Sequence, residues 1–314
     1  MLPSRSRVAQ SASSMKKFTT VGLGELLWDV FPESRQLGGA PANFAYITNL
    51  LGDDGIVASR VGSDELGEEA KARLQSLGLD TSHIQTDATY GTGVARIQVD
   101  AKGQPTFAIA APVAWDFFEW TAAWESLAWK ADVVCFGSLA QRLPQSRQTT
   151  ASFLKALRPQ TTRVFDANLR QPFYSAEILK ESAQHANIMK LNHEELPTVV
   201  SLLGGPRQEE AGAARWLRSA FGLELVCVTR GDKGSLLVGE KGVDEHTGIA
   251  VRVRDTVGAG DAFTAALVHH FLRRHSLSSM NEAANRMGAW VASHTGATPP
   301  RDESQLASVR CERD

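Results

Sequence analysis

The feature that most constrains the fold is a regular alternation of short β-rich runs with helical patterns, which begins at Phe18. FTTVGLG, residues 18–24, is typical of a first strand. Further strand-like runs occupy residues 131–139, 162–168, 187–192 and 224–231. Such alternation is expected to give a mostly parallel sheet with helices on both faces. We therefore predict an α/β fold with three layers, α/β/α.

Two amphipathic helices are predicted near the N-terminus. Pro41 stands at an early helical position and Gly52 just past the end, so the first helix should run from about Pro41 to Leu51. The second is predicted within ELGEEAKARLQSLG, residues 65–78, where apolar residues recur at helical spacing.

A stretch near residue 100 interrupts the alternation. Thr92 to Val99 is β-prone, Asp100 to Gly103 is typical of a turn, and Pro105 to Ile109 reads as a returning strand. These residues predict a hairpin. Together with residues 29–37, the segment from about 91 to 111 is expected to form a small β lid on the main domain, 18–314.

Composition excludes several classes of protein. The formal net charge of -2 over 314 residues lacks the excess of Lys and Arg that is typical of nucleic-acid-binding proteins. A small-molecule ligand is therefore favoured. No apolar run approaches the roughly 18 residues of a membrane span. Three cysteines without CxxC spacing suit a reducing, cytoplasmic setting. Residues 1–17, rich in Ser and Arg and without acids, are expected to be a disordered extension, with an organellar transit peptide as the alternative.

The most informative segment is RDTVGAGDAFTAALVHHFLRRH, residues 254–275, in which a glycine-rich turn runs directly into a helix. The apolar spacing starts this helix close to Gly260 or Asp261, so Gly258, Ala259 and Gly260 lie at its N-terminus. Unpaired N–H groups and the helix dipole make this end an anion site.

Asp261 beside this anion site has two interpretations. As an acid in the first helical turn it would simply stabilise the helix. Beside a bound phosphate it could instead accept the proton of an attacking hydroxyl during phosphoryl transfer. The residues alone leave both interpretations open.

The string DTVGAGDAF resembles the C-terminal signature of the ribokinase-like, or PfkB, family of carbohydrate kinases, and the resemblance covers nearly the whole chain from Phe18. It implies a ribokinase-like fold with ATP and Mg2+ as cofactors. It also implies that Asp261 is the catalytic base and that Gly258, Ala259 and Gly260 hold the γ-phosphate. Asp255 and Thr256 fall where many members bind a monovalent cation such as potassium, although some members do without one.

Two N-terminal strings resemble the sugar-binding elements of the same family. LGGAPANFA, residues 37–45, is similar to its Gly-Gly and Asn element, which implies sugar contacts from Gly38, Gly39 and Asn43. GELLWDVFP, residues 24–32, is similar to fructokinases in particular and implies that Asp29 binds the sugar. Taken alone, the first string is equally a glycine turn followed by a locally bonded Asn.

Three further strings fit the family less specifically. KLNHEEL is similar to its NxxE element, DANLR to its DxNxR stretch, and VTRGDKGSLLV to the strand and turn beneath ATP. An NxxE spacing is also a capping box, and an exposed Arg is also an ordinary ion-pair residue. The roles implied are a magnesium network for Glu195, substrate and phosphate contacts for Asn168 and Arg170, and nucleotide contacts for Lys190, Asn192, Thr229, Gly231 and Asn285.

Rival functions fit the sequence less well. A dinucleotide-binding GxGxxG motif would need glycine where Leu27 stands. A P-loop would need the pattern GxxxxGK, but the nearest spacing, Gly234 to Gly239, continues with Glu240. A non-catalytic sugar sensor on the same fold would be expected to lose Asp261 or the glycines before it. We predict an ATP-dependent sugar kinase, foremost a fructokinase, with kinases for ribose or 2-keto-3-deoxygluconate as alternatives. A homodimer through the β lid is a further expectation.

Overall fold

The computed structural model describes residues 16–31, 33–99, 105–170 and 172–310, and its centre is a nine-stranded sheet. The strands are ordered β13-β12-β11-β10-β9-β8-β1-β4-β5, and all neighbours pair parallel except β12, which is antiparallel to both β11 and β13. Their bounds are β1 Thr19–Leu23, β4 Asp54–Gly62, β5 Ile84–Asp87, β8 Val133–Gly137, β9 Thr162–Asp166, β10 Ile188–Asn192, β11 Leu225–Thr229, β12 Ser235–Gly239 and β13 Gly242–His246. The predicted mostly parallel sheet is confirmed.

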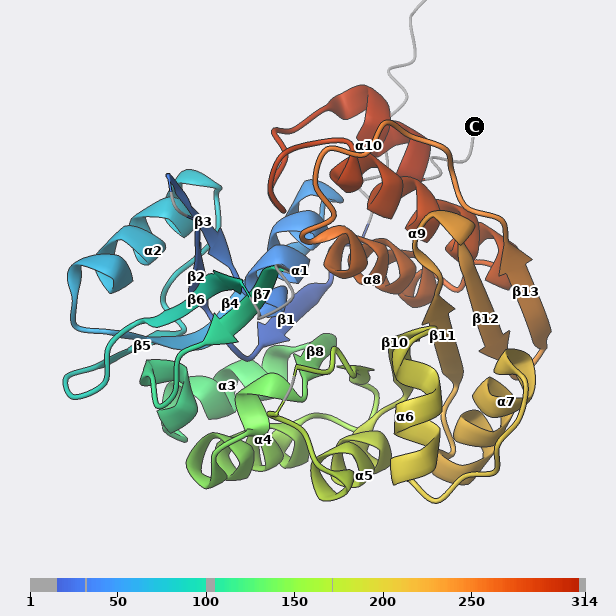
Figure 1. Cartoon of the computed structure of the whole chain (residues 1–314), viewed down its shortest axis with the longest axis horizontal. Coiled ribbons are helices and arrows are strands. Elements are labelled where there is room, and N and C mark those ends of the chain that lie inside the picture. The colour runs from blue at the N-terminus through green and yellow to red at the C-terminus, as the bar shows by residue number, and fades with distance from the viewer. Residues whose placement is uncertain (1–15, 32, 100–104, 171, 311–314) are drawn as a thin grey trace, which may run out of the picture.

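Helices cover both faces of this sheet, as predicted (Figure 1). One face carries α1 Ala40–Leu50, α2 Glu65–Ser76, α8 Ala259–Leu272, α9 Leu277–Ala292 and α10 Glu303–Arg310. The other carries α3 Ala122–Lys130, α4 Pro144–Ala156, α5 Ala176–His185, α6 Glu195–Leu202 and α7 Glu210–Phe221. None of the helices in the described ranges is both long and apolar enough to cross a bilayer.

Two hydrophobic cores follow from the period-two alternation of the strands. On β11, Leu225 and Cys227 join the core under α1, α8 and α9, whereas Val226 and Val228 join the core under α3 to α7. Cys135 on β8 faces the same core as Cys227, and both thiols are buried. Strands buried on both faces read as continuous apolar runs, which is why these strands could be recognised in the sequence.

Helix α1 corrects one expectation, because it is buried nearly all round and not amphipathic. It lies between the sheet and α8, and Gly22 of β1 lets it approach closely. A Cβ added at Gly22 would lie 2.1 Å from the carbonyl oxygen of Pro41. Helix α2, in contrast, is amphipathic as predicted, with Gly67, Ala70 and Leu74 buried.

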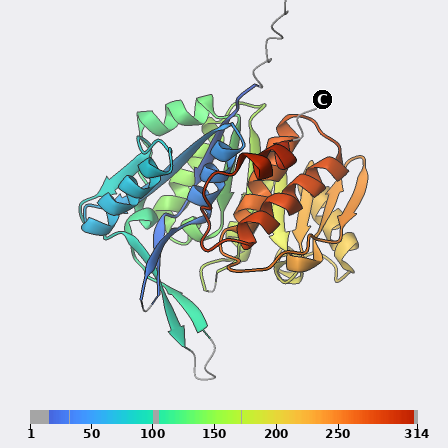
Figure 2. The same cartoon turned by 90° about the horizontal axis from the view of Figure 1, so that it is seen from above.

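A separate four-stranded sheet projects from the body (Figure 2). Its order is β3-β2-β6-β7, with bounds β2 Leu27–Val30, β3 Arg35–Gly38, β6 Gly93–Val99 and β7 Pro105–Ile109. The predicted hairpin and its junction with residues 29–37 are therefore present, while the predicted turn at 100–103 lies outside the described residues. So does the predicted disordered extension up to residue 15.

Asp53, in the corner after α1, ties three parts of the fold together. Its fully buried carboxylate accepts hydrogen bonds from the Arg273 guanidinium at 2.8 and 3.1 Å and from the Phe18 N–H at 3.1 Å, and it lies 2.6 Å from Nδ1 of His269. His269 and Arg273 belong to α8 and the turn that ends it. The position of α8 over the sheet therefore depends on this cluster.

We predict that Asp53→Asn destabilises the protein by about 3 kcal/mol or more, because it leaves Arg273 without its charge partner and disturbs the buried hydrogen bond to His269. Asp54→Asn is the matched control, since the adjacent Asp54 is exposed and only loosely paired with Lys17 at 3.6 Å. The control should change stability by less than about 0.5 kcal/mol. Urea unfolding at neutral pH measures both, and equal effects would contradict the assigned role of Asp53.

Candidate active site

The glycine turn predicted as an anion site opens helix α8, one residue earlier than predicted. Gly258 is the N-cap with φ +75°, and α8 begins at Ala259. A Cβ at Gly258 would lie 2.3 Å from the Cβ of Ala297, so only glycine fits there. A Cβ at Gly260 would lie 3.1 Å from Nζ of Lys190. The turn thus combines helix N–H groups with a nearby ammonium, which suits an anion such as phosphate.

Lys190 and Asp166 form a buried ion pair beneath this turn. The ammonium on β10 donates to both carboxylate oxygens of Asp166, at 3.0 and 3.1 Å. Burial alone would lower the pKa of Lys190, but the charges of Asp166, Glu195 and Asp261 raise it above its usual value. Lys190 therefore stays positively charged across the physiological pH range.

Asp261 is held in the first turn of α8 by a partner from the other end of the chain. Nδ2 of Asn43, on α1, donates to Oδ2 of Asp261 at 2.8 Å. Burial and the charge of Asp166 raise the pKa of Asp261 to about 6, while the Asn43 hydrogen bond, Lys190 and Arg170 oppose the rise. Asp261 is therefore ionised at neutral pH and more basic than an ordinary carboxylate, as a general base requires.

Three of the predicted sugar-binding residues, Asp29, Gly38 and Gly39, lie where β2, β3 and α1 meet. Gly39, with φ +114°, precedes α1, and a Cβ there would lie 2.4 Å from the carbonyl oxygen of Glu25. A Cβ at Gly38 would lie 2.4 Å from Oδ2 of Asp29. Burial raises the pKa of Asp29 to about 6, Arg170 opposes the rise and Asp255 adds to it. The two glycines are thus required where β3 meets α1, and Asp29 is a partly desolvated carboxyl beside them.

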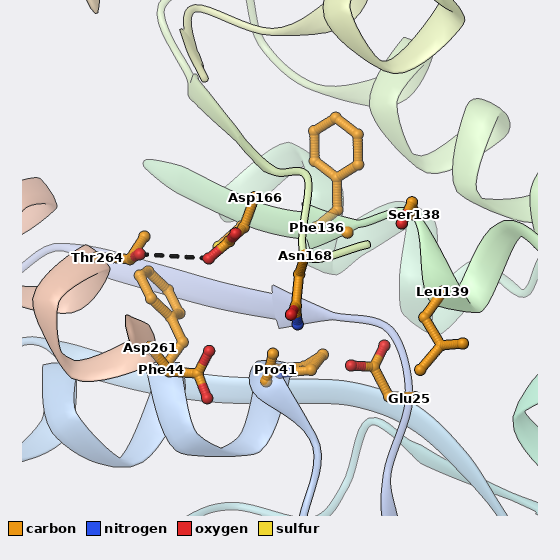
Figure 3. A pocket seen from close by; sticks show the side chains of 13 residues that line it. Glu25, Pro41, Phe44, Phe136, Ser138, Leu139, Asp166, Asn168, Asp261 and Thr264 are labelled. Carbon is orange, nitrogen blue, oxygen red and sulfur yellow. Dashed lines mark hydrogen bonds between the residues drawn. The ribbon is translucent and has the colours of Figure 1, made fainter. Parts of the chain in front are cut away.

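Asn168 and Arg170 follow strand β9. Asn168 adopts φ +38°, an uncommon left-handed conformation for a residue other than glycine, and its amide points into a pocket with Asp261 (Figure 3). Arg170 is exposed, yet its charge lowers the pKa of Glu25, Asp29 and Asp261. The guanidinium therefore lies within electrostatic reach of three acids in the site.

Asn192 and Glu195 realise the capping box that the spacing allowed. Oδ1 of Asn192 accepts from the Glu195 N–H at 2.8 Å, and Oε2 of Glu195 accepts from the Asn192 N–H at 2.8 Å. The other oxygen, Oε1, accepts from the Leu169 N–H at 2.7 Å. Glu195 thus fixes the chain after β9 against the end of β10, and both of its oxygens already have main-chain donors.

The remaining predicted residues lie in the loop before α8, at the end of β11 and on α9. Asp255 accepts from the N–H groups of Val257 and Gly296, both at 3.0 Å, and so joins two loops, while Thr256 beside it is exposed. Thr229 ends β11, and Gly231 follows with φ +62°. Asn285 is buried on α9, where its amide donates to Ser235 and to Asn281 at 2.8 Å. Its described contacts hold α9 against β12.

Two acids of the site, Asp166 and Glu25, were not among the residues predicted from the sequence. Glu25 lies two residues after β1 and lines a small pocket together with Asp166, Asn168 and Asp261 (Figure 3). Its side chain is buried, and burial raises its pKa to about 7. An acid between the glycines and leucines of GLGELL was the available signal, because an apolar run has no structural need for a carboxyl.

Comparison with known proteins relates this geometry to a family. The model of a family described as pfkB family carbohydrate kinase matches residues 20–304. A fructokinase from Salmonella typhimurium is 32% identical over 78% of this chain and 82% of its own length.

Two solved structures share the fold. An uncharacterized sugar kinase, PH1459, from Pyrococcus horikoshii in complex with ATP superposes with a TM-score of 0.78 and 27% identity, covering 93% of this chain and 99% of that one. Fructokinase from Vibrio cholerae O395 in a fructose, ADP and calcium ion bound form superposes with a TM-score of 0.75 and 25% identity, covering 93% and 98%. The predicted ribokinase-like architecture is confirmed.

Proposed function

The chain belongs to the pfkB family of carbohydrate kinases, and on that premise we propose that it transfers the γ-phosphoryl group of ATP to a hydroxyl of fructose. The observation that carries the proposal is the glycine turn at the start of α8 with Asp261 beside it. A fixed anion site next to a carboxylate of raised pKa is what in-line transfer to a hydroxyl needs.

The residues of the site divide the work of the reaction. Asp261 accepts the proton of the attacking hydroxyl, and the amide of Asn43 orients the carboxylate through its hydrogen bond. Gly258, Ala259 and Gly260 offer N–H groups to the charge of the transferring group. Lys190 adds a permanent positive charge below that turn. Bound ATP supplies the phosphoryl group and its leaving group.

The fit of ATP rests on the steric requirement at the turn, where Gly258 excludes any side chain and Gly260 lies next to the Lys190 ammonium. Thr229 and Gly231 are proposed to border the nucleotide, with Asn192 near its phosphates and Asn285 near its base. Arg170 is proposed to offset the negative charge that develops during transfer.

Metal ions complete the proposal. Mg2+ would arrive with the phosphates and keep several waters. Both oxygens of Glu195 accept main-chain N–H groups, and these bonds hold the side chain between the ends of β9 and β10. We propose that it supports the metal site from outside by fixing the ends of β9 and β10. A potassium ion beside Asp255 and Thr256 remains a prediction, as does a cytoplasmic location.

The sugar is proposed to bind between Asp29, Gly38, Gly39, Asn43 and Asn168. Acceptor oxygens and amide groups of this kind recognise hydroxyls. Fructose is the preferred candidate because relatives named fructokinase match most of the chain. The four-stranded sheet, whose strand β2 carries Asp29, is proposed to act as a lid over the bound sugar.

Asp261→Asn should lower kcat by at least about 100-fold, because the acceptor of the hydroxyl proton is lost. The fold should persist and gain stability above pH 6: the raised pKa of Asp261 means that ionisation of this carboxyl disfavours the folded state, and Asn does not ionise. Wild-type kcat/KM should fall as the pH drops through about 6. A coupled assay of ADP release with D-fructose measures this, with Asp54→Asn as control. More than about a tenth of wild-type turnover in Asp261→Asn would exclude Asp261 as the base.

Asp29→Asn should raise the Kd for D-fructose at least about tenfold while changing the Kd for ATP less than about twofold, because a carboxylate that accepts sugar hydroxyls is lost. Glu33→Gln, an exposed acid in the loop between β2 and β3, is the control. Isothermal titration calorimetry gives both constants. Equal losses for sugar and nucleotide would place Asp29 outside the sugar site.

D-fructose should slow hydrogen exchange in β2 and β6, since a lid that closes over a sugar excludes water. The small sheet is also expected to pair with that of a second copy, because so small a sheet gains from another surface to pack on. Light scattering at micromolar concentration should then give twice the chain mass. Unchanged exchange would exclude the lid, and a monomer mass would exclude only the dimer.

A further inference from the structure

Glu25 is a buried carboxyl that the reaction described above does not use. Its relative exposure is 4%, and the nearby main-chain N–H groups of Glu25 itself and of Ala40, the first residue of α1, lower the pKa of its carboxyl against the larger effect of burial. A buried carboxyl is costly unless its remaining lone pairs find donors. Glu25 therefore has capacity to accept more donors than these main-chain groups supply.

The carboxyl of Glu25 points into the same pocket as Asp261. In Figure 3 the amide of Asn168 lies between the two carboxyls, with Pro41 below and Leu139 at the Glu25 end. A sugar that brings one hydroxyl to Asp261 places its other hydroxyls along this pocket. Those hydroxyls would meet Asn168 first and Glu25 next.

We propose that Glu25 is a substrate-contacting specificity residue, which accepts a hydrogen bond from a sugar hydroxyl and makes the site selective for neutral sugars over sugar acids. This inference rests on the proposed kinase function and adds the residue that sets its substrate class. At pH 8, above the pKa of about 7 of Glu25, its carboxylate accepts a hydrogen bond from a hydroxyl and repels the carboxylate of a sugar acid.

The charges around the pocket point the same way. Glu25, Asp29 and Asp261 each interact with the charge of Arg170, and the charge of Asp261 also raises the pKa of Glu25. Lys190, the other cation near these acids, is paired at close range with Asp166. A substrate carboxylate would thus add a negative charge where three acids already share one exposed guanidinium.

The alternative role for Glu25 is structural, through its contact with the Ala40 N–H at the start of α1. Glu25→Gln separates the two roles. It keeps an acceptor oxygen for Ala40 and the volume of the side chain, but it removes the negative charge and turns one end of the group into a donor. Glu224→Gln is the matched control, because Glu224 is exposed and lies before β11.

The experiment is steady-state kinetics of wild type, Glu25→Gln and Glu224→Gln with D-fructose and with 2-keto-3-deoxygluconate, under saturating ATP and Mg2+. Wild type should prefer fructose by about 100-fold or more in kcat/KM. Glu25→Gln should raise the KM for fructose about tenfold, leave the KM for ATP within about twofold, and reduce the preference for fructose at least about tenfold. Glu224→Gln should match wild type.

Several outcomes would overturn the inference. A Glu25→Gln enzyme with wild-type KM and unchanged preference, but a lower Tm, would leave Glu25 only the structural role. A wild type that prefers 2-keto-3-deoxygluconate would refute neutral-sugar selectivity while the kinase function stands. If wild type phosphorylates neither compound, the proposal of fructose fails. In that case, calorimetry should compare the Kd for D-fructose of wild type with that of Glu25→Gln. Equal Kd values, or no binding by wild type, would refute the contact between Glu25 and the sugar.

Discussion

The hydrogen bond between Asn43 and Asp261 connects two segments that are 218 residues apart in the sequence. It can form only because α1 and α8 lie side by side on one face of the sheet, packed closely enough that α1 has almost no exposed surface. Gly22 admits α1 to the sheet, and the Asp53 cluster fixes α8 at its other end. The position of the Asp261 carboxylate therefore depends on helix packing as much as on its own loop.

Much of this arrangement could be predicted, because the strands buried on both faces and the glycine turn before α8 carry strong local signals. Strand β4 could not be predicted. Its sequence, DGIVASRVG, opens with a turn signal and contains Ser59 and Arg60, both of which are buried in the structure. Arg60 is accommodated by an ion pair with Asp87 at 2.8 Å, a partner that only the tertiary structure supplies. The burial of α1 was missed for a similar reason. The spacing of apolar residues shows which face of a helix is apolar, but not how many other elements pack around the helix.

The site residues also divide into those that a local sequence string identifies and those that only tertiary contacts identify. Residues in recognisable strings, such as Asp261 and Asn43, were placed together as expected, whereas Glu25 gained meaning only from the pocket it shares with them. Glu195 was expected in a metal network, and its position shows how a capping box can also fix the geometry between two strand ends. Sequence strings identify which residues are brought together, but the donors and acceptors that each side chain has left to offer depend on its neighbours.

The two buried cysteines have a consequence for how this enzyme meets oxidative stress. Burial raises the pKa of the Cys135 thiol well above its usual value, aided by the negative charges of Asp166 and Asp261, and burial likewise raises that of Cys227. Oxidants and alkylating reagents attack the thiolate form, which is scarce at both positions. Cys135 lines the same pocket as Asp261, and the carboxylates that raise the pKa of its thiol thereby disfavour the reactive thiolate. The thiols of Cys135 and Cys227 should therefore react slowly with oxidants and alkylating reagents at neutral pH.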